Sequence, residues 1–129
     1  MCEWGLMDAK EFGASGEDAA EKHLKGLGYK ILERNYRTKM GELDIVASDG
    51  DTIVFVEVKS RRDKRFGEPE LAVDARKQRQ LTRAAMMYLT RMKKYNSPCR
   101  FDVVSIFSLP GEGLKVKVVR DAFELSEGY

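Results

Sequence analysis

The sequence predicts a single α/β domain of 129 residues, and three observations support this prediction. Apolar side chains recur every three or four residues in two stretches, as in helices that bury one face. Short runs rich in valine, isoleucine and phenylalanine occupy five other stretches, as in strands. The order is helix, three strands, helix, two strands, and a chain of this length forms one core. We expect residues 1–13 and 124–129 to flank the domain as an N-terminal extension and a C-terminal tail.

The first helix is expected to begin at Ser15. The tetrapeptide Ser-Gly-Glu-Asp at this point has the pattern of a capping box, in which a side chain binds the free backbone N–H groups of the first turn. Ala20, Leu24 and Leu27 then recur at helical spacing, and Gly28 follows the last of them. The helix should therefore end shortly before Gly28.

Three strands are expected next, at residues 29–36, 42–48 and 53–60. The second and third flank Asp49-Gly50, the strongest short signal for a hairpin turn, so these two strands should pair antiparallel. The third strand reads IVFVEVKS, and its continuous apolar residues are typical of a strand covered on both faces. Two charged residues interrupt this run, although a buried charge is costly unless it is paired or bound to a metal.

A long second helix is expected from about residue 70 to residue 92, because Pro69 suits a first helical turn. Its apolar stripe consists of Leu81, Ala84 or Ala85, Tyr88 and Met92. Two last strands are expected at residues 100–108 and 114–121, joined by a turn that contains proline and glycine.

The composition of the chain argues against several classes of protein. No apolar run approaches the roughly 20 residues of a membrane span, and the N-terminus lacks a signal-peptide pattern. Cys2 and Cys99 give neither a disulfide framework nor the spacing of a zinc site. We therefore expect a cytoplasmic protein that does not contact a membrane.

Charge is distributed unevenly along the chain. The segment from Lys59 to Arg100 carries 13 Lys or Arg against 4 Asp or Glu, whereas the whole chain has a net charge of only +2. A basic segment beside an acidic remainder indicates a polyanionic partner together with a separate cluster of carboxylates. A basic helix that is merely solvated is the alternative interpretation.

The charged residues of the two hairpin strands are expected to converge. Because side chains alternate along a strand, Glu57 and Lys59 should share one face of the third strand. By the same rule, Glu42 and Asp44 should share one face of the second strand. If these faces coincide, carboxylates from both strands meet beside a lysine.

The register of the hairpin decides how closely they meet. Leu43 and Ile45 should share the apolar face of the second strand. A two-residue loop at Asp49-Gly50 makes Asp44 a diagonal neighbour of Glu57, and a four-residue loop places the two directly opposite each other. A three-residue loop without a bulge would separate them.

Two adjacent carboxylates repel each other, and a hard divalent cation such as Mg²⁺ or Mn²⁺ stabilises the pair. Such an ion lowers the pKa of a bound water, and a nearby lysine such as Lys59 can orient that water. The alternative is a structural ion pair between Glu57 and Lys59 at the sheet edge, with Asp44 solvated beside it. Spacing alone leaves both interpretations open.

The pattern Asp44-x12-Glu57-x-Lys59, preceded by a helix that carries Glu17, resembles the PD-(D/E)xK nuclease superfamily, and within it the archaeal Holliday-junction resolvases. The segments GEDAAEKHLKGLGYKILERNYRTKMGELDIV, FVEVKSR, FGEPELAVDARKQRQL and DAF resemble the YraN family of predicted endonucleases. This resemblance implies a restriction-endonuclease-like αβββαββ core, with a central mixed sheet flanked by helices.

The resemblance also implies roles for individual residues. Asp44 and Glu57 would be metal ligands, with the backbone carbonyl of Val58 as a third. Lys59 would position the attacking water or stabilise developing charge, and Glu17 would complete the acidic site from the first helix. The sequence departs from the superfamily pattern in two places, because it has leucine before the aspartate instead of proline and lacks a Gln-x-x-x-Tyr motif on the long helix.

Further residues would support the site or contact the substrate. Glu42, next to the first ligand in GELD, would contact the ligands without binding the metal. Basic and polar residues would hold a phosphate backbone, although a solvated surface is the alternative for each of them. These residues are Ser60, Arg61, Arg62, Lys64 and Arg65 after the third strand, and Arg76, Arg79 and Arg83 on the second helix.

These interpretations together favour a metal-dependent nuclease that uses Mg²⁺ or Mn²⁺ to hydrolyse DNA. Branched or otherwise structured DNA, in repair or recombination, is the expected substrate, and RNA stays open. The alternative is a nucleic-acid-binding module that keeps a nuclease fold without cleaving. A homodimer is expected if both strands of a junction are cut.

Overall fold

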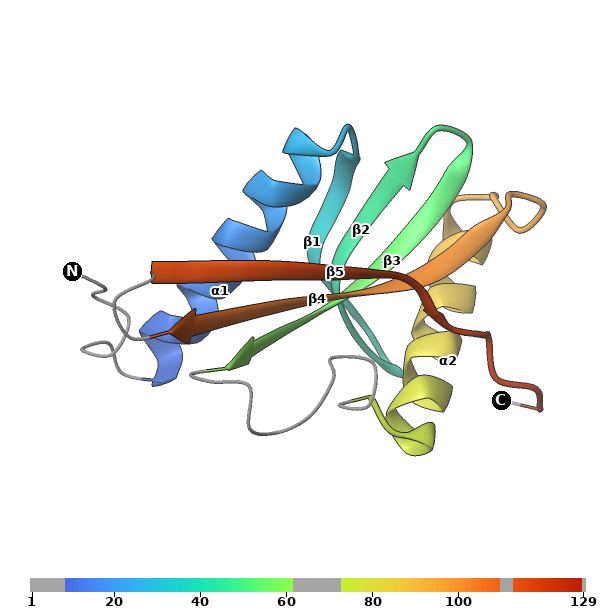
Figure 1. Ribbon diagram of the computed structural model, residues 1–129. Helices are drawn as coiled ribbons and strands as arrows, with labels where there is room; N and C mark the ends of the chain where they lie inside the picture. Colours follow the sequence, from blue (N-terminus) through green and yellow to red (C-terminus); the bar gives the residue numbers. More distant parts are fainter. Residues whose placement is uncertain (1–8, 62–72, 110–112, 129) are drawn as a thin grey trace.

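A computed structural model describes residues 9–61, 73–109 and 113–128 of the chain. Two helices and five strands follow one another in the predicted order (Figure 1). They are α1 (Ala9–Gly26), β1 (Lys30–Thr38), β2 (Gly41–Asp49), β3 (Thr52–Arg61), α2 (Ala75–Arg91), β4 (Cys99–Leu109) and β5 (Gly113–Phe123). The α/β class is therefore confirmed. Neither helix of these segments is long and apolar enough to cross a membrane.

The strands form one mixed sheet in the order β1-β2-β3-β4-β5. β1 with β2, β2 with β3, and β4 with β5 pair antiparallel, whereas β3 and β4 pair parallel. Parallel neighbours cannot be joined by a tight turn, and α2 lies in the connection between β3 and β4. β3 is the central strand, which agrees with its continuous apolar sequence.

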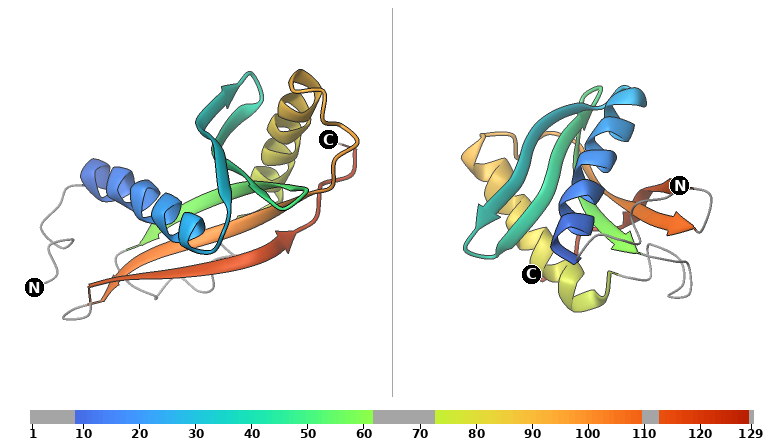
Figure 2. Two further views of the ribbon diagram at one scale, coloured as in Figure 1. Left: turned by 90° about the horizontal axis from the view of Figure 1, so that it is seen from above. Right: turned by 90° about the vertical axis from the view of Figure 1, so that its left-hand side faces the viewer.

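Each helix covers its own face of the sheet. Ala20 and Leu24 of α1 pack in a cluster with Val54 and Val56 of β3. The buried stripe of α2 packs in a second cluster with Phe55 and other residues of the opposite face. Figure 2 shows the two helices on opposite sides of the β1–β2 hairpin. Alternate residues of β3 therefore enter two different cores, and this explains why few polar side chains interrupt the strand.

Both helices begin elsewhere than predicted. α1 already runs at Ala9, so Ser15 lies inside the helix and the predicted capping box is wrong. The start of α2 is later than predicted, because Asp74 is its N-cap and accepts a hydrogen bond of 2.8 Å from the backbone N–H of Lys77. Pro69 lies outside the described residues. The two errors have different causes. The capping pattern at Ser15 does not show whether the chain is already helical before it, whereas α2 begins only after the cap that Asp74 provides.

The hairpin turn between β2 and β3 is displaced by one residue from the prediction. Asp49 pairs with Thr52, so the two-residue turn is Gly50-Asp51. Gly50 has φ of 61°, a left-handed conformation that costs glycine little. This displacement gives β2 and β3 the register expected for a four-residue loop.

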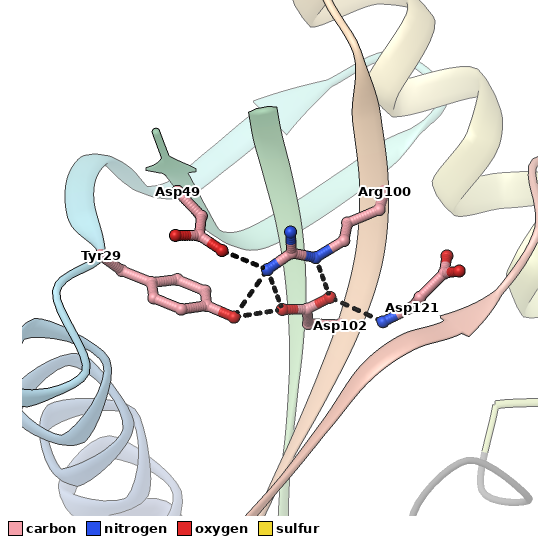
Figure 3. Close-up of polar contacts among 5 residues, drawn as sticks. All are labelled: Tyr29, Asp49, Arg100, Asp102 and Asp121. Atoms are coloured by element: carbon pink, nitrogen blue, oxygen red, sulfur yellow. Dashed lines mark hydrogen bonds and ion pairs between the residues drawn. The ribbon is translucent and has the colours of Figure 1, made fainter. Parts of the chain in front are cut away.

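A buried polar network ties together the ends of several elements on the face that α1 covers (Figure 3). Asp102 of β4 is fully buried and accepts hydrogen bonds from the Tyr29 hydroxyl at 2.8 Å, from Arg100 Nε at 2.9 Å and from the Asp121 backbone N–H at 3.0 Å. Arg100 also contacts Asp49 at 3.0 Å. Because Asp121 lies where the β4–β5 register shifts, the network holds an irregular part of β5 in place.

Replacement of Asp102 by asparagine should destabilise the fold strongly. Asp102→Asn removes the buried negative charge and leaves the Arg100 guanidinium without its closest carboxylate, so we expect a loss of about 3 kcal/mol in the free energy of unfolding. Asp49→Asn is the matched control, because Asp49 is 38% exposed and binds the same guanidinium; its loss should be about 1 kcal/mol or less. Urea denaturation measures both, and equal losses would contradict this account.

Candidate active site

The site forms where β2 separates from β3. The last backbone pair of these strands joins Ile45 and Val56. One residue further, the Asp44 carboxylate accepts a hydrogen bond of 2.8 Å from the backbone N–H of Val58. At this edge of β3 the Asp44 side chain therefore takes the place of a backbone partner. The same hydrogen bond holds the Asp44 carboxylate against the strand that carries Glu57.

The regular alternation of side chains between the two faces of the sheet also breaks at this point. Leu43 packs on the α2 side of the sheet, whereas Ile45 packs on the α1 side. The prediction that these two residues share a face is therefore wrong. The pairs of β1 with β2 place Asn35 opposite Asp44, and Asn35 has φ of 51°, which is unusual for a residue other than glycine. This local break in both strands aims the Asp44 side chain toward β3.

Glu57 is buried next to Asp44. Glu57 is only 7% exposed and lies on the face of β3 that α2 covers. Burial raises the pKa of Glu57 to about 8, and a side-chain hydrogen bond to Asp44 and the negative charge of Asp44 act in the same direction. Glu57 therefore keeps its proton near neutral pH. Glu57 Oε2 is buried and has no hydrogen-bond partner within the described parts of the chain.

Two lysines face this pair of carboxyl groups. Lys77 Nζ, from the first turn of α2, lies 3.8 Å from Glu57 Oε2. Lys59 is half-buried on β3. Both positive charges lower the pKa of Glu57, and the effect of Lys77 is the larger one. Sequence reasoning missed Lys77, because no local pattern shows which residue of α2 lies over the end of β3.

Glu17 and Glu42 lie in a neighbouring group. Glu17 Oε2 is 3.4 Å from Arg34. In the amide orientation that its neighbours favour, the Asn35 nitrogen donates to Glu17 Oε2 at 3.3 Å and to Glu42 Oε1 at 3.1 Å. The residues that the structure describes contain no group of three His, Cys, Asp or Glu placed to hold a metal ion. The structure thus joins Glu17 to Glu42 through Asn35, and it joins Asp44 to Glu57.

α1 nevertheless approaches the end of β3 closely. Gly16 is buried against Ser60, and a Cβ atom at this position would collide with the Ser60 hydroxyl. Glycine is therefore needed here for close contact between helix and strand. Glu17, the next residue, is held beside the end of β3 by this contact.

The predicted phosphate-binding residues divide into three groups. Arg76, Arg79 and Arg83 are exposed on α2. Ser60 is half-buried against α1, and Arg61 ends β3. The remaining three, Arg62, Lys64 and Arg65, lie outside the described residues.

Comparison with other proteins identifies the family. A family model described as "Uncharacterised protein family UPF0102" matches residues 16–106. The chain belongs to the UPF0102 family. This is the YraN-like group that the sequence motifs resemble. The matched region contains Asp44, Glu57, Lys59 and Lys77.

Several UPF0102 proteins are similar over almost their whole length. One from Syntrophus aciditrophicus is 50% identical over 118 residues, which cover 90% of this chain and 91% of that protein. One from Caldicellulosiruptor saccharolyticus is 47% identical over 118 residues, covering 91% of this chain and all of that protein. A third, from Geobacter sulfurreducens, is 46% identical over 117 residues, covering 91% of each chain.

The raised pKa of Glu57 predicts how stability depends on pH when chelator is present. The folded chain keeps a proton on Glu57 up to a pKa of about 8, whereas the unfolded chain releases it near the ordinary value of 4.5. Its contribution to the free energy of unfolding is therefore complete below about pH 4.5 and is lost as pH rises to about 8. Glu57→Gln should remove this loss, which amounts to about 5 kcal/mol at most.

Urea denaturation at about pH 5 and about pH 8 in EDTA measures the difference. Glu127→Gln is the control, because Glu127 is exposed near the C-terminus. An equal decline in wild type and in Glu57→Gln would show that Glu57 does not carry the proton.

Proposed function

We propose that this UPF0102 protein is a metal-dependent nuclease that hydrolyses phosphodiester bonds of DNA, with branched or otherwise structured DNA as its substrate in repair or recombination. The observation that carries the proposal is the buried Glu57 against the half-buried Asp44, beside Lys59 and Lys77 and at one end of a helix rich in arginine. A purely structural ion pair would not require a second carboxylate against the first.

The two carboxyl groups fit a hard divalent cation. The buried Glu57 Oε2 has no hydrogen-bond partner within the described residues, and Glu57 keeps a proton near neutral pH because burial and the neighbouring Asp44 raise its pKa to about 8. A cation would replace that proton. Mg²⁺ typically uses one or two carboxylates and fills its remaining positions with water and phosphate oxygens. We assign Asp44 and Glu57 as the ligands of Mg²⁺ or Mn²⁺, with the Val58 carbonyl as a third.

The bound cation would supply a water of lowered pKa and would offset charge on the phosphate. The residues of the chain have separate roles around it. Asp44 is held in place by the Val58 N–H, so its carboxylate needs little reorganisation to bind. Lys59 would orient the attacking water or donate to the phosphate. Lys77 lies 3.8 Å from Glu57 Oε2 in the metal-free chain and would contact a phosphate oxygen in the complex.

Glu17 has a further role in this proposal. It would complete the acidic site from α1 by a side-chain movement away from Arg34, while Glu42 would hold the ligands indirectly through Asn35. The contact between Gly16 and Ser60 keeps α1 close enough to the end of β3 for this movement.

The substrate follows from the charge of α2. The helix carries Arg76, Lys77, Arg79, Arg83 and Arg91 and contains no Asp or Glu. Neighbouring cations on one helix repel each other, and a polyanion relieves that repulsion. Because Lys77 belongs to the site, the phosphates of a bound strand would continue from the site along the arginines.

The architecture supports the same proposal. A mixed sheet in which three antiparallel strands are followed by a helix and a parallel strand agrees with the restriction-endonuclease-like core that the motifs imply. In that core the acidic residues lie on the second and third strands, as Asp44 and Glu57 do here. A homodimer would allow two such sites to cut both strands of a junction.

Loss of either carboxylate should abolish cation binding and cleavage together. Asp44→Asn and Glu57→Gln each remove one negative ligand, so cleavage of a four-way junction in Mg²⁺ or Mn²⁺ should fall by a factor of about 100 or more. Calorimetric titration with Mn²⁺ should show the corresponding loss of affinity. Glu127→Gln should leave both unchanged.

Two results would contradict this proposal. If linear, nicked and four-way-junction DNA stay uncut by the wild type although it binds them in a salt-dependent manner, the protein is a non-cleaving nucleic-acid-binding module on this fold. If cleavage survives in Asp44→Asn, another site is responsible.

The two lysines should differ in their kinetic effects. Lys59→Met should lower kcat by a factor of about 100 with little change in Mn²⁺ affinity, because Lys59 would act on the water and the transition state. Lys77→Met should instead tighten Mn²⁺ binding in the absence of DNA, since Lys77 competes with the cation for Glu57 Oε2. Lys94→Met, on the exposed segment after α2, is the control. Equal effects of the two site lysines would contradict these separate roles.

A further inference from the structure

We infer that the outward face of α2 binds an unpaired DNA strand, with the phosphates on its arginines and one base in a methionine-lined pocket. The inference rests on the proposed nuclease function, because it describes where the strand that enters the site continues. It adds a base-binding subsite that the site residues do not contain.

The pocket lies between the C-terminal half of α2 and the turn that joins β1 to β2. It has a volume of about 590 Å³, within the range of about 300 to 1,000 Å³ that is common for small-molecule sites. Its lining residues are Met40, Arg83, Met86, Met87, Thr90 and Arg91. Met40 is 45% exposed, which is high for so large an apolar side chain. The pocket is therefore mostly apolar, with two cations beside it.

The pocket is continuous with the basic part of the same helix face. Arg76, Arg79 and Arg83 recur at intervals of three and four, and Met86, Met87 and Thr90 continue this spacing. Met86 lies at the margin of this face, because it is half-buried and also packs partly against the core. The outward face of α2 is thus basic in its N-terminal half and apolar in its C-terminal half. A ligand that fits both halves must combine negative charge with apolar surface.

An unpaired nucleotide has this combination. The bases of a duplex are stacked inside it and leave mainly phosphates and groove edges at the surface, so a duplex offers little to Met86 and Met87. An unstacked base exposes a flat π surface, and the methionine thioether makes favourable contacts with such rings. Arg91 is held beside the pocket by the Tyr36 hydroxyl at 2.8 Å, where its charge can face a phosphate.

Other occupants fit the charge less well. A second copy of this chain placed with the same face inward would bring two arginine rows together. A protein helix would need acidic residues along one half and apolar residues along the other, whereas a DNA strand carries a phosphate at every nucleotide. The distance from Lys77 to Met87 along the helix is about 15 Å. A DNA strand of about four nucleotides or fewer spans this distance.

Binding to labelled oligonucleotides in EDTA tests the inference without cleavage. The probes are a single-stranded oligonucleotide that contains 2-aminopurine, a fluorescent base whose emission rises when it leaves its stack, and the matching blunt duplex. Met86→Ala/Met87→Ala should weaken single-strand binding about fivefold or more, abolish the rise in emission, and leave duplex binding unchanged. Met92→Ala is the control, because Met92 is 38% exposed and lies outside the pocket lining.

The arginines should act differently from the methionines. Arg79→Gln/Arg83→Gln should weaken binding of both probes and lower the salt dependence of the binding constant by about one unit per residue. Lys115→Gln, on the exposed side of β5, is the matched control. Circular dichroism melting of each variant checks that the fold is retained.

Each outcome decides between the two proposals. If the variants change oligonucleotide binding as expected but the wild type cleaves no DNA in Mg²⁺ or Mn²⁺, the base-binding subsite is supported and the nuclease proposal is overturned. Cleavage lost in Asp44→Asn, together with unchanged binding in the methionine variant, supports the nuclease and overturns the base pocket. Equal effects of the methionine variant on single strand and duplex also overturn the pocket. Binding of an acidic peptide in place of DNA overturns the choice of occupant.

Discussion

The hydrogen bond between the Val58 N–H and the Asp44 carboxylate is the constraint on which the site depends. β3 continues past the point where β2 leaves it, and an unpaired N–H at such an edge needs a partner. Asp44 provides one, and as a result a second carboxylate is held against the buried Glu57. The left-handed conformation of Asn35 and the change of face between Leu43 and Ile45 belong to the same local break. Strand geometry, rather than a flexible loop, thus sets the distance between the two acidic groups.

The crossover between the parallel strands explains why α2 participates. β3 and β4 are neighbours, so the chain must return across the sheet, and α2 covers the face to which Glu57 points. The first turn of α2 then lies over the end of β3 and presents Lys77. On the opposite face, the network around Asp102 ties β4 to Tyr29, which directly precedes β1, and to β5. The site is therefore mounted on strands whose ends are fixed from both sides.

Sequence reasoning predicted the order of the elements from their periodicity and the pairing of β2 with β3 from the turn signal between them. It left the meeting of Asp44 with Glu57 dependent on the register of this hairpin. It failed where the outcome depended on the neighbouring chain. The pattern at Ser15 could not show that the helix had already begun, and strand alternation could not foresee the break at Asp44. The roles of Lys77 and Asp102 depend on contacts across the sheet, which no spacing along the sequence encodes.

The position of Glu17 follows from electrostatics. A third carboxylate beside Asp44 and Glu57 would add negative charge to a site that already raises the pKa of Glu57 to about 8, so in the metal-free chain Glu17 is more stable with Arg34. Its contact with Arg34 is 3.4 Å, longer than the 2.8 Å between Arg34 and Asp18, so Asp18 would keep the arginine paired if Glu17 turned away. In the proposed nuclease, a divalent cation would reverse the sign of the field at the site. Glu17 would then have a partner in both states, Arg34 in the metal-free chain and the cation in the metal-bound nuclease.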